Sequence, residues 1–510
     1  MRLILFFTTI LLFFTTLSSA QKTKIEHRIS SENKLENGAS DYLFKCFAED
    51  GGVLIGQSFY KSMMVRSIKG YEMKYFDSNL KLKKSFIYEK KNSVILSSII
   101  KDNTIYLVEA HFDYFGEEVE FFMSSSPLND INFVETKLFT FTSKEVLGNV
   151  IDANGSINEN SPINVSFSSR KENFLINFKI RDKSKTSYHF YLFDINSNLI
   201  FKQSTTKNEK DRKIDFQNLF FNDENQSAYF MLKMKTKNKK NGGKYFYEIF
   251  KISKEKVISK PIDVGDKYFP DLKLFEIKNS PACLGIYSNE DDEKGAGVVY
   301  YKFNPDNLDL EIKKFSVLSE QYFIDKYGKE KDKETKNVFI RSIGVNDDST
   351  ILVNAEEYYT KGEEKVDQPT FSFYKDIIAL KLDDKGELLW SRNIDKYQGS
   401  ASYDQHLSFK TIFNNGNSHL ILNNSRSANF LKNGTYKLKG NLTEKCELLV
   451  LTITSDGEFS GKRILDSKVN SWPFFTNDSF MKQESNYLLL IGKKGRKWQL
   501  LKLFYKMDKL

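Results

Sequence analysis

The chain has 510 residues, a formal net charge of +9 and an aromatic content of 14%. The excess of Lys and Arg (76) over Asp and Glu (67) is small, and the charged runs at 207–213 and 326–336 mix both signs. The sequence contains neither a one-signed basic stripe nor a nucleic-acid reader motif, so we expect no nucleic-acid partner. The 44 Phe and 26 Tyr favour β-structure, and the length suffices for a large core.

The N-terminus has the order of a secretory signal peptide. Arg2 precedes an apolar run from Leu3 to Leu17, and Ser18-Ser19-Ala20 then offers small residues for cleavage before Gln21. The alternative is an uncleaved anchor, but the run is shorter than the roughly 20 residues that a membrane-spanning helix needs. We therefore predict a signal peptide over 1–20 and a mature body over 21–510 without a membrane span. The expected location is secreted, periplasmic or cell-surface associated.

The body consists of short alternating strands separated by turn residues. At 447–465 an apolar run meets Asp456-Gly457, a strong hairpin signal, and a second strand follows. Most such hairpins follow another strand pair, so four-strand units repeat every 50–80 residues, which is typical of propeller blades. The same hairpin pattern recurs at 71–86, 121–139, 190–204, 247–262, 299–315 and 377–394.

This repeat predicts an all-β fold, a β-propeller of about eight (seven to eight) four-stranded blades. The eighth blade would combine strands from 472–508 with an outer strand from 24–30, so that both termini close the ring and no sheet edge is left open. Two successive β-sandwich or smaller propeller domains are the rival architecture. The seven complete blades are expected at 40–88, 90–140, 150–206, 214–264, 269–319, 336–397 and 404–467.

One stretch resembles a known repeat. The segment from Ala379 to Trp390 is similar to the Trp-bearing repeat of quinoprotein-like propellers, since Gly386 and Trp390 have the spacing of that motif. Ala379 lies one residue too far away, Lys385 replaces the usual Thr, and the adjacent-cysteine pair of alcohol-oxidising quinoproteins is absent. The resemblance implies blade geometry and no quinone cofactor. The export signal and the Lys-, Asn- and Phe-rich body also resemble secreted proteins of Bacteroidetes-type bacteria, which implies no particular activity.

The sequence contains no concentrated catalytic or metal motif. HExxH, CxxC and GxSxG are absent, and the acidic loops at 152–160 and 288–295 do not complete a calcium-binding pattern. We therefore expect neither a metal nor another cofactor. The three cysteines, Cys46, Cys283 and Cys446, lie in separate repeats beside apolar residues and are predicted to be buried without a disulfide.

Long connections are expected on one face of the propeller. We label the strands of each blade A to D from the inside outwards. The predicted A–B and C–D turns are short. The long connections run from B to C or from D to the next A, and both kinds emerge on the same face. Two B-strand exits, 105–118 and 351–364, pass from apolar strand into aromatic and acidic residues. Such residues can stack on a sugar or peptide and accept its hydrogen bonds. The predicted ligand-binding residues are Glu109, His111, Asp113, Glu356, Glu357 and Tyr358.

These observations leave three hypotheses for function. The first is an exported, non-enzymatic binding or scaffold propeller that recognises a protein, peptide or glycan on its long-loop face. The second is a secreted hydrolase or lyase that acts on polysaccharide or peptide through carboxylates in the central funnel, since a glycosidase needs only two carboxylates in one pocket. The third is a structural component of a cell-surface assembly. We favour the first hypothesis, with an unidentified protein or glycan partner and a monomeric chain.

Overall fold

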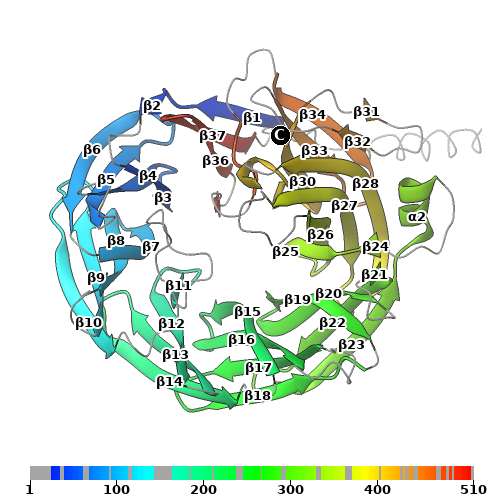
Figure 1. The fold of residues 1–510 in the computed structure, drawn as a ribbon, viewed down its shortest axis with the longest axis horizontal. Helices are drawn as coiled ribbons and strands as arrows, with labels where there is room; N and C mark the ends of the chain where they lie inside the picture. The colour runs from blue at the N-terminus through cyan, green and yellow to red at the C-terminus, as the bar shows by residue number, and fades with distance from the viewer. Residues whose placement is uncertain are drawn as a thin grey trace, which may run out of the picture.

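The computed structural model is a closed ring of β-sheets around a central axis (Figure 1). It describes residues 24–34, 39–60, 68–90, 93–112, 118–142, 163–182, 185–208, 212–236, 245–265, 267–288, 294–328, 335–361, 370–400, 404–425, 429–430, 436–439, 446–466, 473–477, 482–484 and 487–506. The predicted signal peptide over 1–20 lies outside these residues. Within them, no helix combines the length and the apolar character that crossing a bilayer would require.

Eight antiparallel sheets form the blades of a propeller, which confirms the predicted fold class and blade number and excludes the rival of two successive domains. Blade 1 is β3 (Ala39–Phe47), β4 (Val53–Tyr60), β5 (Ile68–Phe76) and β6 (Leu82–Glu89). Blade 2 is β7 (Ser93–Lys101), β8 (Thr104–Phe112), β9 (Glu118–Pro127) and β10 (Val134–Thr142). Blade 3 is β11 (Ile163–Phe167), β12 (Asn173–Asp182), β13 (Lys185–Asp194) and β14 (Leu199–Asn208). Blade 4 is β15 (Arg212–Asn222), β16 (Ser227–Thr236), β17 (Tyr245–Ile252) and β18 (Val257–Ile262).

The second half of the chain continues the pattern. Blade 5 is β19 (Tyr268–Ile277), β20 (Ser280–Ser288), β22 (Gly297–Phe303) and β23 (Leu310–Val317). Blade 6 is β25 (Val338–Val345), β26 (Ile351–Lys361), β27 (Phe371–Leu382) and β28 (Leu388–Ser400), and blade 7 is β29 (Lys410–Asn414), β30 (Asn417–Asn424), β33 (Glu447–Ile453) and β34 (Phe459–Leu465). The smaller elements are β21 (Lys294–Gly295), β24 (Thr335–Lys336), α2 (Glu320–Tyr327), the 3₁₀ turn Asp404–His406, β31 (Asn429–Phe430) and β32 (Tyr436–Lys439).

Blade 8 is built from both ends of the chain, as the sequence predicts. It contains β35 (Lys482–Glu484), β36 (Tyr487–Lys494) and β37 (Lys497–Lys506), and the N-terminal β1 (Lys24–Ile29) pairs antiparallel with β37 from Lys24↔Lys506 to Ile29↔Leu501. A further short strand, β2 (Asn33–Lys34), pairs with the other end of β37. This arrangement satisfies the backbone groups at the outer edge of β37, which would otherwise be open to other chains.

The core lies between neighbouring blades. Every residue of β20 is buried, because this strand is covered on both faces by adjacent sheets. Between blades 5 and 6, for example, Leu284 and Tyr300 pack in one cluster with Val353 and Leu380. The three cysteines, which lie in blades 1, 5 and 7, are buried and form no disulfide, in agreement with the sequence prediction.

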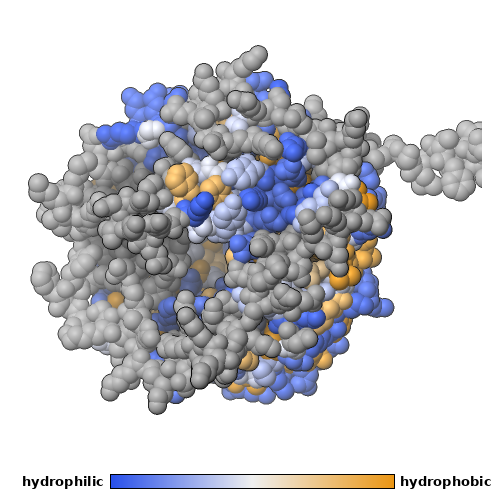
Figure 2. Space-filling view, turned by 45° about the vertical axis from the view of Figure 1, so that its right-hand side comes forward, coloured by the Kyte–Doolittle hydropathy of each residue, from blue (hydrophilic) through white to orange (hydrophobic). Residues whose placement is uncertain are grey.

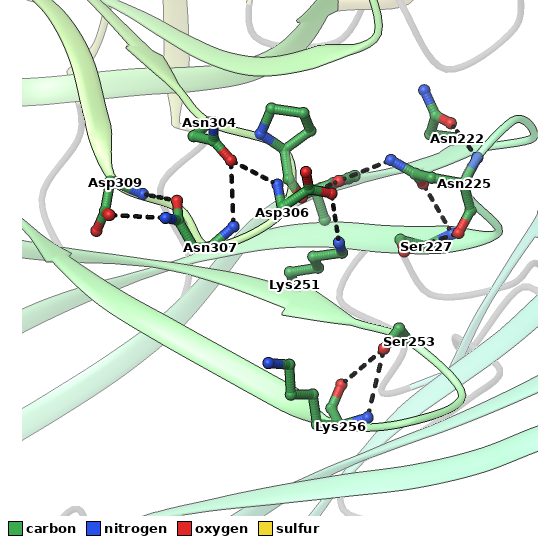
Figure 3. A network of polar contacts seen from close by, with 12 residues as sticks. Asn222, Asn225, Ser227, Lys251, Ser253, Lys256, Asn304, Asp306, Asn307 and Asp309 are labelled. Carbon is green, nitrogen blue, oxygen red and sulfur yellow. Dashed lines mark hydrogen bonds and ion pairs between the residues drawn. The ribbon is translucent and has the colours of Figure 1, made fainter.

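Side-chain hydrogen bonds fix the short turns of blades 4 and 5 (Figure 3). Asn304 Oδ1 accepts the backbone N–H of Asp306 at 2.9 Å, and Asn225 Oδ1 accepts the backbone N–H of Ser227 at 3.1 Å. Elsewhere Gly386 and Gly457 adopt φ values of +83° and +82°, which L-residues with a Cβ rarely tolerate. These turns are therefore held by local contacts and by backbone conformation.

Connection lengths differ between the two faces in blades 1 to 7. The A–B and C–D turns contain two to six residues. The antiparallel order places all B–C and D–A connections at the opposite ends of the strands. These include the long connections after β10, β23 and β30, although other members of the class are short, such as the two residues between β12 and β13. We call this side the long-loop face.

The segment that resembles a quinoprotein repeat forms the C–D hairpin of blade 6. Trp390 Nε1 donates a hydrogen bond to the backbone oxygen of Ser455, in the C–D turn of blade 7, at 2.9 Å. An added Cβ at Gly457 would lie only 3.2 Å from the Trp390 ring. The Trp residue therefore joins the hairpins of adjacent blades, which is the blade geometry that the resemblance implies.

Candidate functional site

The two predicted B-strand exits lie in different parts of the ring. β8 carries Glu109 and His111, and β26 carries Glu356, Glu357 and Tyr358. Figure 1 shows β8 and β26 on opposite sides of the central axis. The structure therefore does not bring the two sets into one site, and each is described by itself. Asp113 lies outside the described residues.

Glu109 is a buried residue between blades 1 and 2. Its carboxylate is 0% exposed and accepts hydrogen bonds from Tyr88 Oη and Ser93 Oγ, both at 2.7 Å. Lys90 Nζ lies 3.7 Å from the same carboxylate. His111, two residues further along, packs edge-on against Phe122, and burial followed by the charge of Lys90 lowers its pKa. These contacts join two blades.

Glu356 is likewise buried, between blades 6 and 7. Its Oε1 lies 2.7 Å from Lys396 Nζ, and both side chains are 0% exposed. Its Oε2 accepts hydrogen bonds from Arg341 Nε at 2.9 Å and from Ser408 Oγ at 2.6 Å. Lys396 Nζ also donates to the backbone oxygen of Tyr374 at 3.1 Å. Burial lowers the pKa of Lys396, while the charge of Glu356 opposes this shift.

A row of bulges crosses blade 6 just beyond Glu356. The register between β26 and β27 shifts between Glu356 and Tyr358, and the register between β27 and β28 shifts between Tyr374 and Ile377. A bulge inserts an extra residue and redirects the side chains that follow, and such features are enriched next to functional sites. Here two residues of β27, Lys375 and Asp376, lie against the single residue Glu357 of β26.

The bulge row holds a group of paired charges next to α2. Lys326, from the last turn of α2, forms ion pairs with Glu357 and, at 2.8 Å, with Asp376. The preceding residue, Asp325, accepts a 2.7 Å hydrogen bond from Arg392 Nε. Burial raises the pKa of Glu357, whereas Lys326 opposes that shift. The four charges of Lys326, Lys375, Glu357 and Asp376 sum to zero.

A row of half-buried and exposed rings lies beside these charges, and we call it the aromatic strip. It consists of Tyr359, Phe371, Phe373 and Tyr397, on β26, β27 and β28. The Phe373 ring is stacked with Tyr359 at 5.0 Å between centroids and with Phe371 at 6.4 Å, and it lies 6.0 Å from Tyr397. Phe371 is 45% exposed and Tyr397 is 39% exposed, so the strip offers ring surface to solvent.

A lysine and a glycine complete the aromatic strip. Lys375 Nζ lies 4.9 Å from the centroid of Tyr359 and 5.6 Å from that of Tyr397, within the range of a cation–π contact. A Cβ at Gly399 would approach the Phe373 ring to 3.0 Å, so the missing side chain lets this ring lie close to the strand. Figure 2 shows hydrophilic and hydrophobic residues interleaved over the described part of this side of the molecule.

The sequence prediction came within one residue of the strip. It selected Tyr358, whose ring faces inward against Tyr374 at 4.8 Å and lies under the Arg341 guanidinium at 5.5 Å. The next residue, Tyr359, faces the other way. Phe371, Phe373 and Tyr397 were missed, although the alternating aromatics in 371–374 carried a signal, because which face is exposed depends on the bulges.

In the part of the chain that the structure describes, no group of three or more His, Cys, Asp or Glu residues is arranged to hold a metal ion. No protein-family model and no curated protein matches the sequence.

Solved structures with similar folds have low identity and low TM-scores. The WD40 domain of SCAP from fission yeast has 7% identity and a TM-score of 0.38, with 95% of this chain and 98% of that chain covered. An oligogalacturonate lyase in complex with manganese has 10% identity and a TM-score of 0.38, with 95% and 96% covered. The β-propeller domain of the Trilobed protease from Pyrococcus furiosus has 9% identity and a TM-score of 0.36, with 85% and 98% covered.

Proposed function

We propose that this protein is an exported, non-enzymatic binding or scaffold propeller that recognises a protein, peptide or glycan on its long-loop face. The observation that carries the proposal is the aromatic strip on blade 6, where four neighbouring rings lie at one end of three strands. Exposed aromatic residues on rigid elements give contact area at a low cost in conformational entropy. The strip is therefore suited to recognition.

The ion pairs next to the strip favour a binding function over a catalytic one. Glu356, Lys396 and Arg341 form a buried group on the inward side of the same strands, with each charge next to an opposite one. On the outward side, Lys326 holds Glu357 and Asp376 together. Paired charges fix the positions of strands and leave few groups ready for proton transfer. Of the predicted contact residues, Glu356 and Tyr358 then act as supports beneath the strip and Glu357 as its margin, whereas Glu109 and His111 lie in blade 2.

A direct test measures binding of the mature chain, 21–510, to a panel of immobilised polysaccharides and peptides. Phe371→Ala removes the most exposed ring of the strip and should weaken any binding to the strip, whereas Phe246→Ala, which removes an exposed ring on blade 4, should not. Unchanged binding by the Phe371 variant would overturn the proposal. His111→Ala and Tyr358→Ala test the two strand exits in the same assay.

The alternative is a secreted hydrolase or lyase that uses a pair of carboxylates. One observation favours it: burial raises the pKa of Glu357, as a general acid requires, and Asp376 lies close enough to share Lys326. Release of new reducing ends from a bound polysaccharide, abolished by Glu357→Gln, would establish the enzyme. Binding without product release supports the scaffold.

Export remains part of the proposal. The apolar run followed by Ser18-Ser19-Ala20 supports cleavage before Gln21, and β1 begins a few residues later, at Lys24. N-terminal sequencing of the exported protein should therefore read from Gln21. An intact Met1 would overturn this part.

A further inference from the structure

We infer that the aromatic strip and the two lysines on the same face of blade 6, Lys361 and Lys375, bind an extended acidic segment of a protein partner. This inference rests on the proposed function and names its partner class. Three features of blade 6 lead to it: the charge that faces solvent, the covering of the rings by one another and the covering of the sheet edge.

The two lysines share the face of the sheet that carries the strip. In the register of β26 and β27, Tyr359 lies opposite Phe373 and Lys361 lies opposite Phe371. Residues directly opposite each other project from the same face of an antiparallel sheet. Lys375 Nζ lies 4.9 Å from the centroid of the Tyr359 ring and therefore belongs to this face too. Because Phe371 and Lys375 are four residues apart on one strand, the backbone positions of the two lysines lie about 13 Å apart along the strands.

The charge that this face offers to solvent is positive. The side chains of Glu357 and Asp376 are 14% and 17% exposed, and both are paired with Lys326. Lys361 is exposed and Lys375 is half-buried, and no carboxylate in the described part of the chain forms an ion pair with either of them. A partner that approaches the strip therefore meets two ammonium groups before it meets a carboxylate. Complementary charge steers association and excludes wrong partners, so an acidic partner is favoured.

The rings of the strip favour a peptide over a sugar or a nucleic-acid base. The rings of Tyr359 and Phe373 are stacked on each other at 5.0 Å, and the Lys375 ammonium lies over Tyr359. Bases bind to aromatic side chains by stacking on free ring faces, and a flat sugar ring needs the same surface. Phe371 and Tyr397, 45% and 39% exposed, remain as separate apolar contacts. Single apolar side chains of a peptide can pack against such contacts.

The outer edge of β28 is closed to strand addition, so the partner segment must be recognised through its side chains. β32, which belongs to the connection between β30 and β33 of blade 7, pairs in parallel with β28 from Asp395↔Lys437 to Tyr397↔Lys439. A peptide that binds by adding a strand needs unpaired backbone groups at a sheet edge. At this edge those groups are already used, which leaves the two lysines and the exposed rings as the recognition surface.

Binding to a peptide array tests the inference with defined probes. Each nine-residue peptide has either Asp or Asn at its third and seventh positions, about 13 Å apart when extended, and varied apolar residues between them. We expect the mature chain, 21–510, to bind the Asp set more strongly than the Asn set. Lys361→Gln and Lys375→Gln should each weaken that binding about threefold, the effect of one partly exposed charge pair. Lys83→Gln, which makes the same change of net charge at an exposed position on blade 1, should leave it unchanged.

Two further variants identify the strip as the contact. Phe371→Ala removes the most exposed ring and should weaken binding of the Asp set at least about fivefold, whereas Phe246→Ala on blade 4 should not. The double variant Lys361→Glu with Lys375→Glu should reverse the preference, so that a matched Lys set binds better than the Asp set. A loss of packing alone would not cause such a reversal.

The outcomes separate the partner class from the proposed function. Equal binding of the Asp and Asn sets, or a preference for Asp that Lys83→Gln lowers as much as the strip variants do, overturns the inference. If Asn peptides or polygalacturonate bind and Phe371→Ala weakens that binding, the proposed function stands and the partner class is wrong. If no probe binds in a manner that depends on Phe371, both fail. Matched melting temperatures of the variants exclude misfolding as the cause of any loss.

Discussion

Glu356→Gln removes the negative charge that lies between Lys396 and Arg341. Lys396 is fully buried, and its 2.7 Å contact with Glu356 is the ion pair that compensates its charge. Removing one partner of a buried pair costs about 3–5 kcal/mol, because the other charge is left in a medium of low dielectric constant. We therefore expect the free energy of unfolding to fall by about that amount, measured by urea denaturation.

The structure also predicts an asymmetry between the two partners. In Lys396→Met, the Glu356 carboxylate still accepts hydrogen bonds from Arg341 and Ser408, so this variant should lose about 1–3 kcal/mol. The double variant should lose clearly less than the sum of the single variants, since the two side chains are in direct contact. Lys260→Met is the matched control, because Lys260 pairs with Asp309 in an exposed position and should contribute less than about 1 kcal/mol.

A pH dependence separates a charge effect from a packing effect. Burial lowers the pKa of Lys396 in the folded state, and Glu356 counteracts this. In Glu356→Gln the pKa should fall further, so the folded state binds fewer protons than the unfolded state, in which the lysine pKa is about 10.4. Stability of this variant should then rise as the pH increases towards the unfolded-state pKa of about 10.4. The reasoning is refuted if Glu356→Gln costs no more than Lys260→Met, or if its deficit is independent of pH.

Other ionisable groups give three further expectations. Burial lowers the pKa of His419 to about 4, so stability should decline as pH falls from about 6.5 towards 4, by about 3 kcal/mol in total, and His419→Gln should remove most of this decline in urea titrations. Burial raises the pKa of Tyr229 to about 12, so the free energy of unfolding should fall as the pH rises above about 10. Tyrosinate absorbance that titrates freely while the protein stays folded would contradict this. Burial raises the pKa of Cys446 to about 12 and that of Cys283 further, and all three cysteines are buried. The three thiols should therefore react with a thiol reagent only after denaturation. Rapid reaction of the native protein would count against the buried positions.

The order of the blades could be predicted from the sequence because it depends on local rules. Asp456-Gly457 and similar turns fix where strands reverse, and the apolar runs between them fix which strands lie inside. The strands predicted over 472–508 lack an outer strand, and the segment 24–30 could supply it. The pairing of β1 with β37 follows from that requirement to close the ring.

The character of the candidate site was decided by tertiary structure. The sequence places Glu109 and Glu356 at similar strand exits, but Glu109 packs against blade 1 and Glu356 against the segment that leads into blade 7. Side chains alternate between the faces of a strand, so a single inserted residue reverses every side chain after it. The register shift beyond Glu356 sets two residues of β27, Lys375 and Asp376, against Glu357 alone, so the reversal falls on β27 and puts Phe371 and Phe373 on the same side as Tyr359. No pattern in the sequence locates such a bulge, because it arises from the pairing of strands that are distant in the chain. The residues, turns and strand order are thus determined locally, whereas the choice of exposed ring depends on register, which only the assembled sheet fixes.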